Sequence, residues 1–324
     1  MKPIYIRGVG IISRCAMNFD DLLKIAADKP VAINRDKKLT FPPNAPSSKI
    51  RRAPRYTRML VSAAASAKSD ANLPADLDKA RVGTIFSSGF GSLESTLQFT
   101  DSLLPGKPDL VSPTLASYSV ANAGVGQICI LNGFTGFSTL LTGGDPLEYS
   151  SMLLASDKAD VIFCGAADEY NDDLNTAIKS CGILQDNISD GAAVLILSTD
   201  ADKSYCRLKK FSSDSLSAYP YIHETDTRDG AAILSEIVSA YEEPEVVLTQ
   251  CNGSYFDAVE KSVLTEKFPT AELIDAKKYF GETLGGGYLL NVALGAAFIK
   301  IGRCKSLLAA GIDVHGNYLT AFLD

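Results

Sequence analysis

The sequence predicts an α/β protein made of two related halves, with helices between and outside two buried sheets. Short apolar runs bounded by glycine turns alternate with helical stretches, which is typical of strands covered by helices. The order of strand, glycine turn, helix and strand then repeats along the chain, as an internal duplication would produce. The chain has 324 residues, and we expect halves at residues 1–200 and 201–324 to form one compact unit, since neither half buries its sheet alone.

In the first half, the short apolar runs predict strands and the longer stretches with a polar side predict helices. The proline-, lysine- and asparagine-rich segment 29–48 predicts a surface loop. Strands are expected at residues 4–12, 81–88, 137–141, 160–165 and 192–198. Helices are expected at residues 18–27, 58–71, 93–104, 115–131 and directly after Asp145. The run at 137–141 is compact and apolar, and a strand covered on both faces has this composition.

The second half repeats this order with a new set of residues. Strands are expected at residues 207–213, 245–249, 271–274, 306–310 and 318–322, and helices at 228–241, 254–268 and 284–301. Segment 81–89 matches the pattern of 245–253, the glycines at 143–144 match those at 285–287, and segment 159–165 matches 305–311. These three matches, in the same order, are the basis for the predicted duplication.

Composition excludes several classes of protein. A net charge of −7 disfavours a general nucleic-acid binder, and no run approaches the roughly 18 apolar residues of a membrane span. The first residues read as a strand and lack a signal-peptide cleavage site, so the expected location is the cytoplasm. Seven cysteines lie mostly in apolar runs, which favours reduced thiols, and the two histidines form no metal cluster. A basic cluster at residues 49–58 reads as a solvated helix start or as a patch for an acidic partner.

The stretch from Gly133 to Glu169 organises the chain. It reads as a strand, a sharp glycine turn, a helix and a second strand. Gly143 and Gly144 form the turn, Asp145 is a good N-cap, and Pro146 suits the first helical position. Many enzymes hold a nucleophile at such a turn, because the helix N-terminus stabilises a thiolate or an oxyanion. Here the residue at the turn is an aspartate.

Several motifs, taken in order, resemble the β-ketoacyl synthases of fatty acid and polyketide assembly, which have the thiolase fold. The resemblance runs nearly the whole length of the chain. It rests on the opening strand GVGIIS at 8–13, VSP at 111–113 with NAGVGQ at 122–127, GFTG at 133–136, DGAAVL at 190–195, and Lys277 with Gly281 and TLG at 283–285. The resemblance implies a thiolase-like fold with duplicated αβ halves in αβαβα layers, and it implies no cofactor or metal.

The same resemblance places the family's reactive residues on unreactive ones. The cysteine position falls on Asp145, with Gly144 as the alternative, and the two histidine positions fall on Asn252 and Glu282. Lys277 alone is retained, and its spacing of five allows it to pair with Glu282. The chain's own histidines, His223 and His315, lie off these motifs. Because a thiolate and two imidazoles carry the family's condensation, this activity is expected to be lost.

The resemblance also implies a pocket and a dimer edge. The pocket residues are Gly143, Gly144, Gly253, Ser254, Gly316 and Asn317. The strand at 137–141 is expected to pair antiparallel with its counterpart across a two-fold axis, because it would otherwise be an exposed edge. The residues of this dimer edge are Phe137, Ser138, Thr139, Leu140 and Leu141.

The favoured function is a non-catalytic partner of an active ketosynthase, like the chain-length factors of the same family, in fatty acid, polyketide or aryl-polyene biosynthesis. Such a subunit needs shape complementarity and no nucleophile. The implied partners are an active ketosynthase or a second copy of the chain, together with an acyl carrier protein. One alternative is a homodimeric acyl-binding or scaffold protein. Another is an enzyme that hydrolyses or decarboxylates thioesters with Asp145, Glu282 or Lys277, since paired carboxylates in an apolar pocket can act as acid and base.

Overall fold

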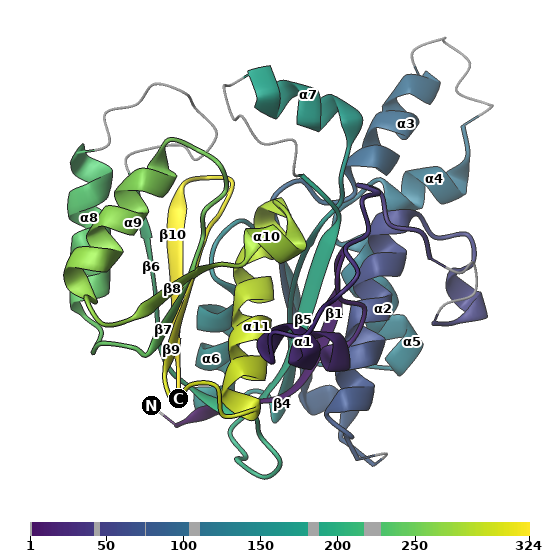
Figure 1. The fold of residues 1–324 in the computed structure, drawn as a ribbon. Coiled ribbons are helices and arrows are strands. Elements are labelled where there is room, and N and C mark those ends of the chain that lie inside the picture. Colours follow the sequence, from purple (N-terminus) through teal and green to yellow (C-terminus); the bar gives the residue numbers. More distant parts are fainter. Residues whose placement is uncertain (1, 42–45, 75, 104–110, 181–187, 217–227) are drawn as a thin grey trace.

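The computed structural model describes residues 2–41, 46–74, 76–103, 111–180, 188–216 and 228–324. Its centre is one continuous sheet of ten strands with helices on both faces (Figure 1). The first half contributes β1 (Ile4–Ile12), β2 (Val82–Ser88), β3 (Ser138–Thr142), β4 (Val161–Asp168) and β5 (Gly191–Ser198). The second contributes β6 (Cys206–Ser215), β7 (Val246–Thr249), β8 (Glu272–Asp275), β9 (Leu307–Ile312) and β10 (Asn317–Leu323).

The strand order confirms the duplication. The sheet runs β3-β2-β4-β5-β1-β6-β10-β9-β7-β8, so each half places its third, second, fourth, fifth and first strands in that order, and the two halves meet at their first strands. The second strand of each half pairs in parallel with its third and fourth strands, while the remaining pairs are antiparallel. The two predicted sheets are therefore joined, through a short antiparallel pairing of Ile4–Ile6 with residues 206–208. The division after residue 200 stays a prediction.

The helices form three layers around the two halves of the sheet (Figure 1). One outer layer contains α2 (Arg55–Asp70) and α5 (Ala123–Asn132), and the other contains α8 (Arg228–Ser239) and α9 (Phe256–Lys267). Between the halves lie α6 (Pro146–Ala155) and α11 (Gly287–Lys300). Three separate clusters of buried apolar side chains fill the interfaces between these layers. The layering is the predicted αβαβα arrangement.

Close packing of β1 on α2 explains the glycines of the first strand. A methyl group built on Gly10 would lie 1.9 Å from the carbonyl oxygen of Ala63 in α2. Gly8 meets the same helix, where its methyl group would lie 2.7 Å from the carbonyl oxygen of Ala67. Only glycine leaves room for backbone contact at this distance. The alanine-rich α2 and these two glycines therefore fix the spacing of the outer layer.

Some predicted elements are corrected by the structure. The helix expected at 115–131 is two helices, α4 (Pro113–Tyr118) and α5, because Asn122, a weak helix former, lies at the junction as the N-cap of α5. The helix expected from residue 284 begins with a short 3-10 turn, Leu284–Gly286, before α11. The strand expected to be covered on both faces is β3, which is the edge of the sheet and is partly exposed.

The remaining helices lie around the carboxyl ends of the strands or beside α11. They are α1 (Phe19–Ala26), α3 (Leu93–Leu103), α7 (Asp172–Ser180) and α10 (Lys277–Phe280). Across the described parts of the chain, every helix is too short or too polar to cross a membrane. The six cysteines within the described residues are free thiols.

Candidate functional site

The turn between β3 and α6 has the backbone geometry of an elbow. Gly143 and Gly144 have φ angles of 72° and 81°, in the region that favours glycine. Asp145 follows in an extended conformation, and its side chain accepts a hydrogen bond of 2.8 Å from the backbone N–H of Leu147. Pro146 occupies the first helical position, where no backbone donor is needed. The predicted sharp turn and helix cap are both present.

Asp145 is enclosed by protein. The residue is only 6% exposed. Its second carboxylate oxygen accepts a hydrogen bond of 3.4 Å from the hydroxyl of Tyr288 in α11. Burial raises the pKa of the Asp145 carboxyl to about 7, and the nearby charge of Glu148 also raises it. The neighbouring Cys164 thiol is also buried, which raises its pKa far above the neutral range. Neither group is a ready nucleophile at neutral pH.

Lys277 and Glu282 form a buried ion pair. The Lys277 ammonium lies 2.7 Å from a carboxylate oxygen of Glu282, and the two side chains are 9% and 4% exposed. The second carboxylate oxygen accepts the backbone N–H of Leu284 at 2.5 Å. The pair thus closes the turn between α10 and α11. Both of its charges are used within the fold.

Asn252 lies in the loop that follows β7 and is 1% exposed. Its side-chain oxygen accepts the backbone N–H of Ser254 at 3.0 Å, and the N–H of Gly253 bonds to the Asp257 carboxylate at 2.9 Å. Among the described atoms, the amide nitrogen of Asn252 has no hydrogen-bond partner. The next residue back, Cys251, is a buried thiol whose pKa burial raises to about 12.

Glu260 in α9 holds the loop that carries Asn252. It accepts the backbone N–H groups of Gln250 at 2.9 Å and Cys251 at 3.2 Å, and the hydroxyl of Tyr318 at 2.5 Å. Sequence reasoning missed this residue. An acidic side chain on the apolar side of a predicted helix was the available signal, because a buried carboxylate needs donors nearby.

Asp313, just after β9, brings the elbow and the terminal loop together. One of its oxygens accepts the backbone N–H of Gly144 at 2.7 Å and the side-chain amide of Asn317 at 2.7 Å. In the same loop, the Nε2 atom of His315 lies 3.2 Å from the carbonyl oxygen of Thr142. His315 is off the family's motifs in the sequence, but the loop after β9 brings it next to the elbow. His223 lies outside the described residues.

Asp168, the last residue of β4, makes the reciprocal connection. Its carboxylate accepts the hydroxyl of Ser88 at 2.7 Å and the backbone N–H groups of Gly89, Phe90 and Gly91 at 2.8–3.2 Å. It also accepts the N–H of Gly285, at 2.8 Å, in the turn before α11. Each half therefore supplies a carboxylate that holds the turn preceding the other half's central helix.

The predicted dimer edge is open in the single chain. In β3, Ser138 and Thr142 are exposed and the three residues between them are half-buried. Four large apolar side chains are also exposed, by 43% to 72%: Phe137 directly before β3, Val120 between α4 and α5, Ile130 of α5, and Met152 of α6. Apolar residues occur on both the buried and the exposed sides of α5. The exposed side of this helix therefore has the composition of an interaction surface.

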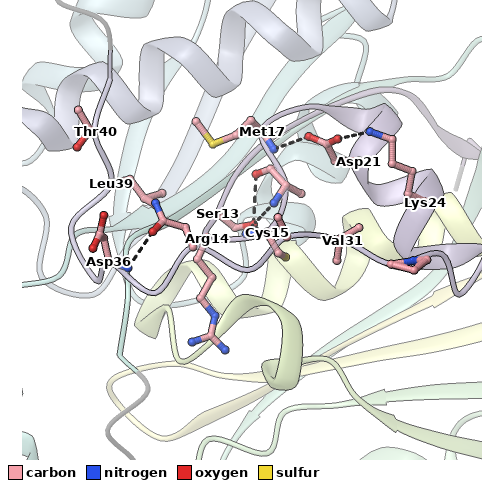
Figure 2. A pocket seen from close by; sticks show the side chains of 14 residues that line it. Ser13, Arg14, Cys15, Met17, Asp21, Lys24, Val31, Asp36, Leu39 and Thr40 are labelled. Atoms are coloured by element: carbon pink, nitrogen blue, oxygen red, sulfur yellow. Dashed lines mark hydrogen bonds and ion pairs between the residues drawn. The ribbon is translucent and has the colours of Figure 1, made fainter.

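A cavity of about 530 Å³ lies apart from the elbow, between the loop after β1, α1 and residues 30–40 (Figure 2). Figure 2 shows Arg14 pointing out of this cavity, away from Met17 and Leu39. Its guanidinium donates to the carbonyl oxygens of Tyr279 and Lys277, at 2.9 and 3.3 Å, and so binds the end of α10. Cys15 in the cavity wall is a buried thiol whose pKa burial raises to about 11.

The basic cluster at residues 49–58 divides into two groups. Arg55 forms ion pairs with Asp190 and Glu169 and donates to the carbonyl oxygen of Tyr170. Arg58 donates to the carbonyl oxygen of Phe41. These two arginines serve the fold, so the expectation of one solvated or partner-binding cluster is wrong for them. Lys49, Arg51 and Arg52 remain exposed.

No protein-family model matches the chain, and no curated protein matches it by sequence. Solved structures do match. A type II PKS acyl-carrier protein in complex with its ketosynthase bound to the hexaketide gives a TM-score of 0.79 at 17% identity, over 100% of this chain and 99% of that one. A β-ketoacyl synthase from Burkholderia phymatum STM815 gives 0.80 at 14% identity, with the same coverage. The ishigamide ketosynthase/chain length factor gives 0.78 at 16% identity, over 99% of each chain. The chain therefore has the fold of these ketosynthases, as the motifs predict.

Proposed function

We propose that this chain is a non-catalytic ketosynthase homologue that acts as the partner subunit of an active ketosynthase, in the manner of a chain-length factor. One observation carries the proposal: the positions of the reactive residues are filled by side chains that bond within the fold. Asp145 caps a helix, Asn252 holds its own loop, and Glu282 is paired with Lys277. The scaffold around them is complete.

The exposed edge supports a partner. An unpaired strand flanked by apolar side chains favours pairing with a second chain. An active ketosynthase has the same fold and can offer a matching edge, and one structural neighbour is a ketosynthase/chain length factor. An acyl carrier protein would then reach the complex through the active subunit.

The test is joint purification of this chain with a candidate active ketosynthase from the same organism. We expect the two to elute together and deletion of this chain to change the length of the product. Ile130 in α5 is 72% exposed, so Ile130→Lys places a charge within the exposed apolar surface and should abolish the association. Ile301→Lys is the matched control, because Ile301 is 41% exposed at the far end of α11. Separate elution together with an unchanged product would refute the proposal.

A second candidate is an enzyme with altered thioester chemistry. The observation in its favour is Asp145, a buried carboxyl whose pKa of about 7 suits a general acid or base. Turnover of malonyl or acyl thioesters that disappears in Asp145→Ala, with the variant still folded, would establish it. A third candidate, a homodimeric acyl-binding or scaffold protein, predicts twice the chain mass in light scattering without any ketosynthase present.

A further inference from the structure

A second cavity, of about 290 Å³, lies between the start of α2, α3 and α4. It belongs neither to the elbow nor to the apolar edge. Its polar lining residues are Arg52, Ser95, Gln98, Ser112, Thr114 and Tyr118.

Among the residues that the structure describes, the lining of this cavity carries one sign of charge. Arg52 is the charged group among the described residues that line the cavity, and the other polar members carry hydroxyl or amide groups. Arg55 and Arg58 are held by internal bonds, whereas Arg52 is exposed. A guanidinium with neighbouring hydroxyl donors and no carboxylate is the chemistry that recognises phosphate.

Two serines add donors at fixed places. Ser95 is 1% exposed in the first turns of α3, and it lines the cavity. The Ser112 oxygen accepts the backbone N–H of Leu115 at 3.4 Å, which leaves its own proton available to a ligand. Ser95 lies within α3 and Ser112 is the N-cap of α4, so helices fix the backbone positions of both serines.

We propose that this cavity binds the phosphate monoester group of a small molecule, with Arg52 pairing with the phosphate and Ser95 and Ser112 donating to it. The volume is near the lower end of ligand cavities, about 300 Å³, so it accommodates more than a bare phosphate. Pro54 and Leu115 provide the apolar side for the attached carbon group. This site is independent of the proposed partnership with a ketosynthase.

The test uses the full chain with two probes, glycerol 3-phosphate and inorganic phosphate, at constant ionic strength maintained with chloride. Calorimetric titration and the thermal unfolding midpoint are the readouts, because a ligand that binds the folded chain raises the midpoint with its concentration. We expect saturable binding of the ester, weakened at least tenfold by Arg52→Gln and several-fold by Ser95→Ala.

The matched control is Arg51→Gln, since Arg51 is also exposed but does not line the cavity. It should bind the ester as the unmodified chain does, and circular dichroism should show every variant folded. An equal loss in Arg51→Gln would reduce the effect to general surface charge and overturn the proposal. Equal affinity for inorganic phosphate would refute the preference for a phosphate monoester. Absence of saturable binding with both probes would refute the existence of the site.

Discussion

The carboxylate of Asp145 caps α6 from a position with little access to water, so its ionisation opposes folding. The folded pKa of about 7 lies above the ordinary value of 3.8. Between these two pH values the folded chain binds a proton that the unfolded chain has released. The contribution of Asp145 to the unfolding free energy therefore falls as pH rises through this window, and levels off above it.

Asp145→Asn tests this effect while keeping the cap, since asparagine and aspartate are comparable N-caps. At pH 8 the variant should exceed the unmodified chain in unfolding free energy by about 2–4 kcal/mol, and the excess should shrink toward pH 5. Urea unfolding of both chains at several pH values measures this difference in unfolding free energy. Contributions from the other buried carboxyls are common to both chains and cancel in the difference. A gap that stays constant with pH would contradict the assignment.

The Lys277–Glu282 pair gives a second prediction at this scale. Lys277→Met leaves the Glu282 carboxylate buried without its cation, and we expect a loss of about 3–5 kcal/mol in unfolding free energy. The double variant Lys277→Met with Glu282→Gln should recover much of that loss, because no charge is then buried. Denaturant unfolding of the single and double variants gives the coupling energy; equal losses in both would argue against a structural pair.

At the scale of elements, β1 and α2 are in contact through their backbones. Gly10→Ala should destabilise the chain by about 1–3 kcal/mol or more, because the added methyl group meets the Ala63 carbonyl of α2. Gly126→Ala is the control: a methyl group there meets nothing within 4 Å, and alanine favours the α5 helix by about 1 kcal/mol. Thermal unfolding should move in opposite directions for the two variants. A fall of similar size in both would contradict the packing argument.

Most strands and helices were predictable, because each one has a recognisable local sequence pattern. Short apolar runs gave strands such as β5, and the glycine turn with Asp145 and Pro146 gave the start of α6. Exposure was harder to predict. The apolar run at β3 has the composition of a covered strand, yet β3 is the edge of the sheet and is partly exposed, because a local pattern does not reveal where a strand lies in the strand order.

At the scale of the whole molecule, the candidate site depends on contacts that no local pattern reveals. The motifs located Asp145, Asn252, Lys277 and Glu282, but they did not reveal that Asp313 bonds to Gly144 and Asp168 to Gly285, each from the opposite half. From the sequence alone, Asp168 and Asp313 are recognisable only as acidic residues at the ends of apolar strands. Their partners follow from the strand order, which becomes known only once the two halves are seen together.

Asp168→Ala tests the connection between the halves. The change removes the acceptor for the backbone N–H groups of Gly89, Phe90 and Gly285, among others, and each buried donor left unpaired costs about 1–3 kcal/mol. We expect a total loss of about 3–5 kcal/mol in unfolding free energy and faster hydrogen exchange in the turns before α3 and α11. Asp172→Ala, on an exposed side chain of α7, is the control. A cost below 1 kcal/mol for Asp168→Ala would show that this carboxylate contributes little to holding the two halves together.

The place of β1 in the sheet has a consequence for synthesis on the ribosome. β1 emerges before both of its partner strands, since Tyr5 pairs with Ser198 of β5 and with Arg207 of β6. The centre of the sheet must therefore wait until about 200 further residues have been translated. Such long delays expose apolar segments to aggregation and to chaperones, so slow translation should reduce the yield of native chain.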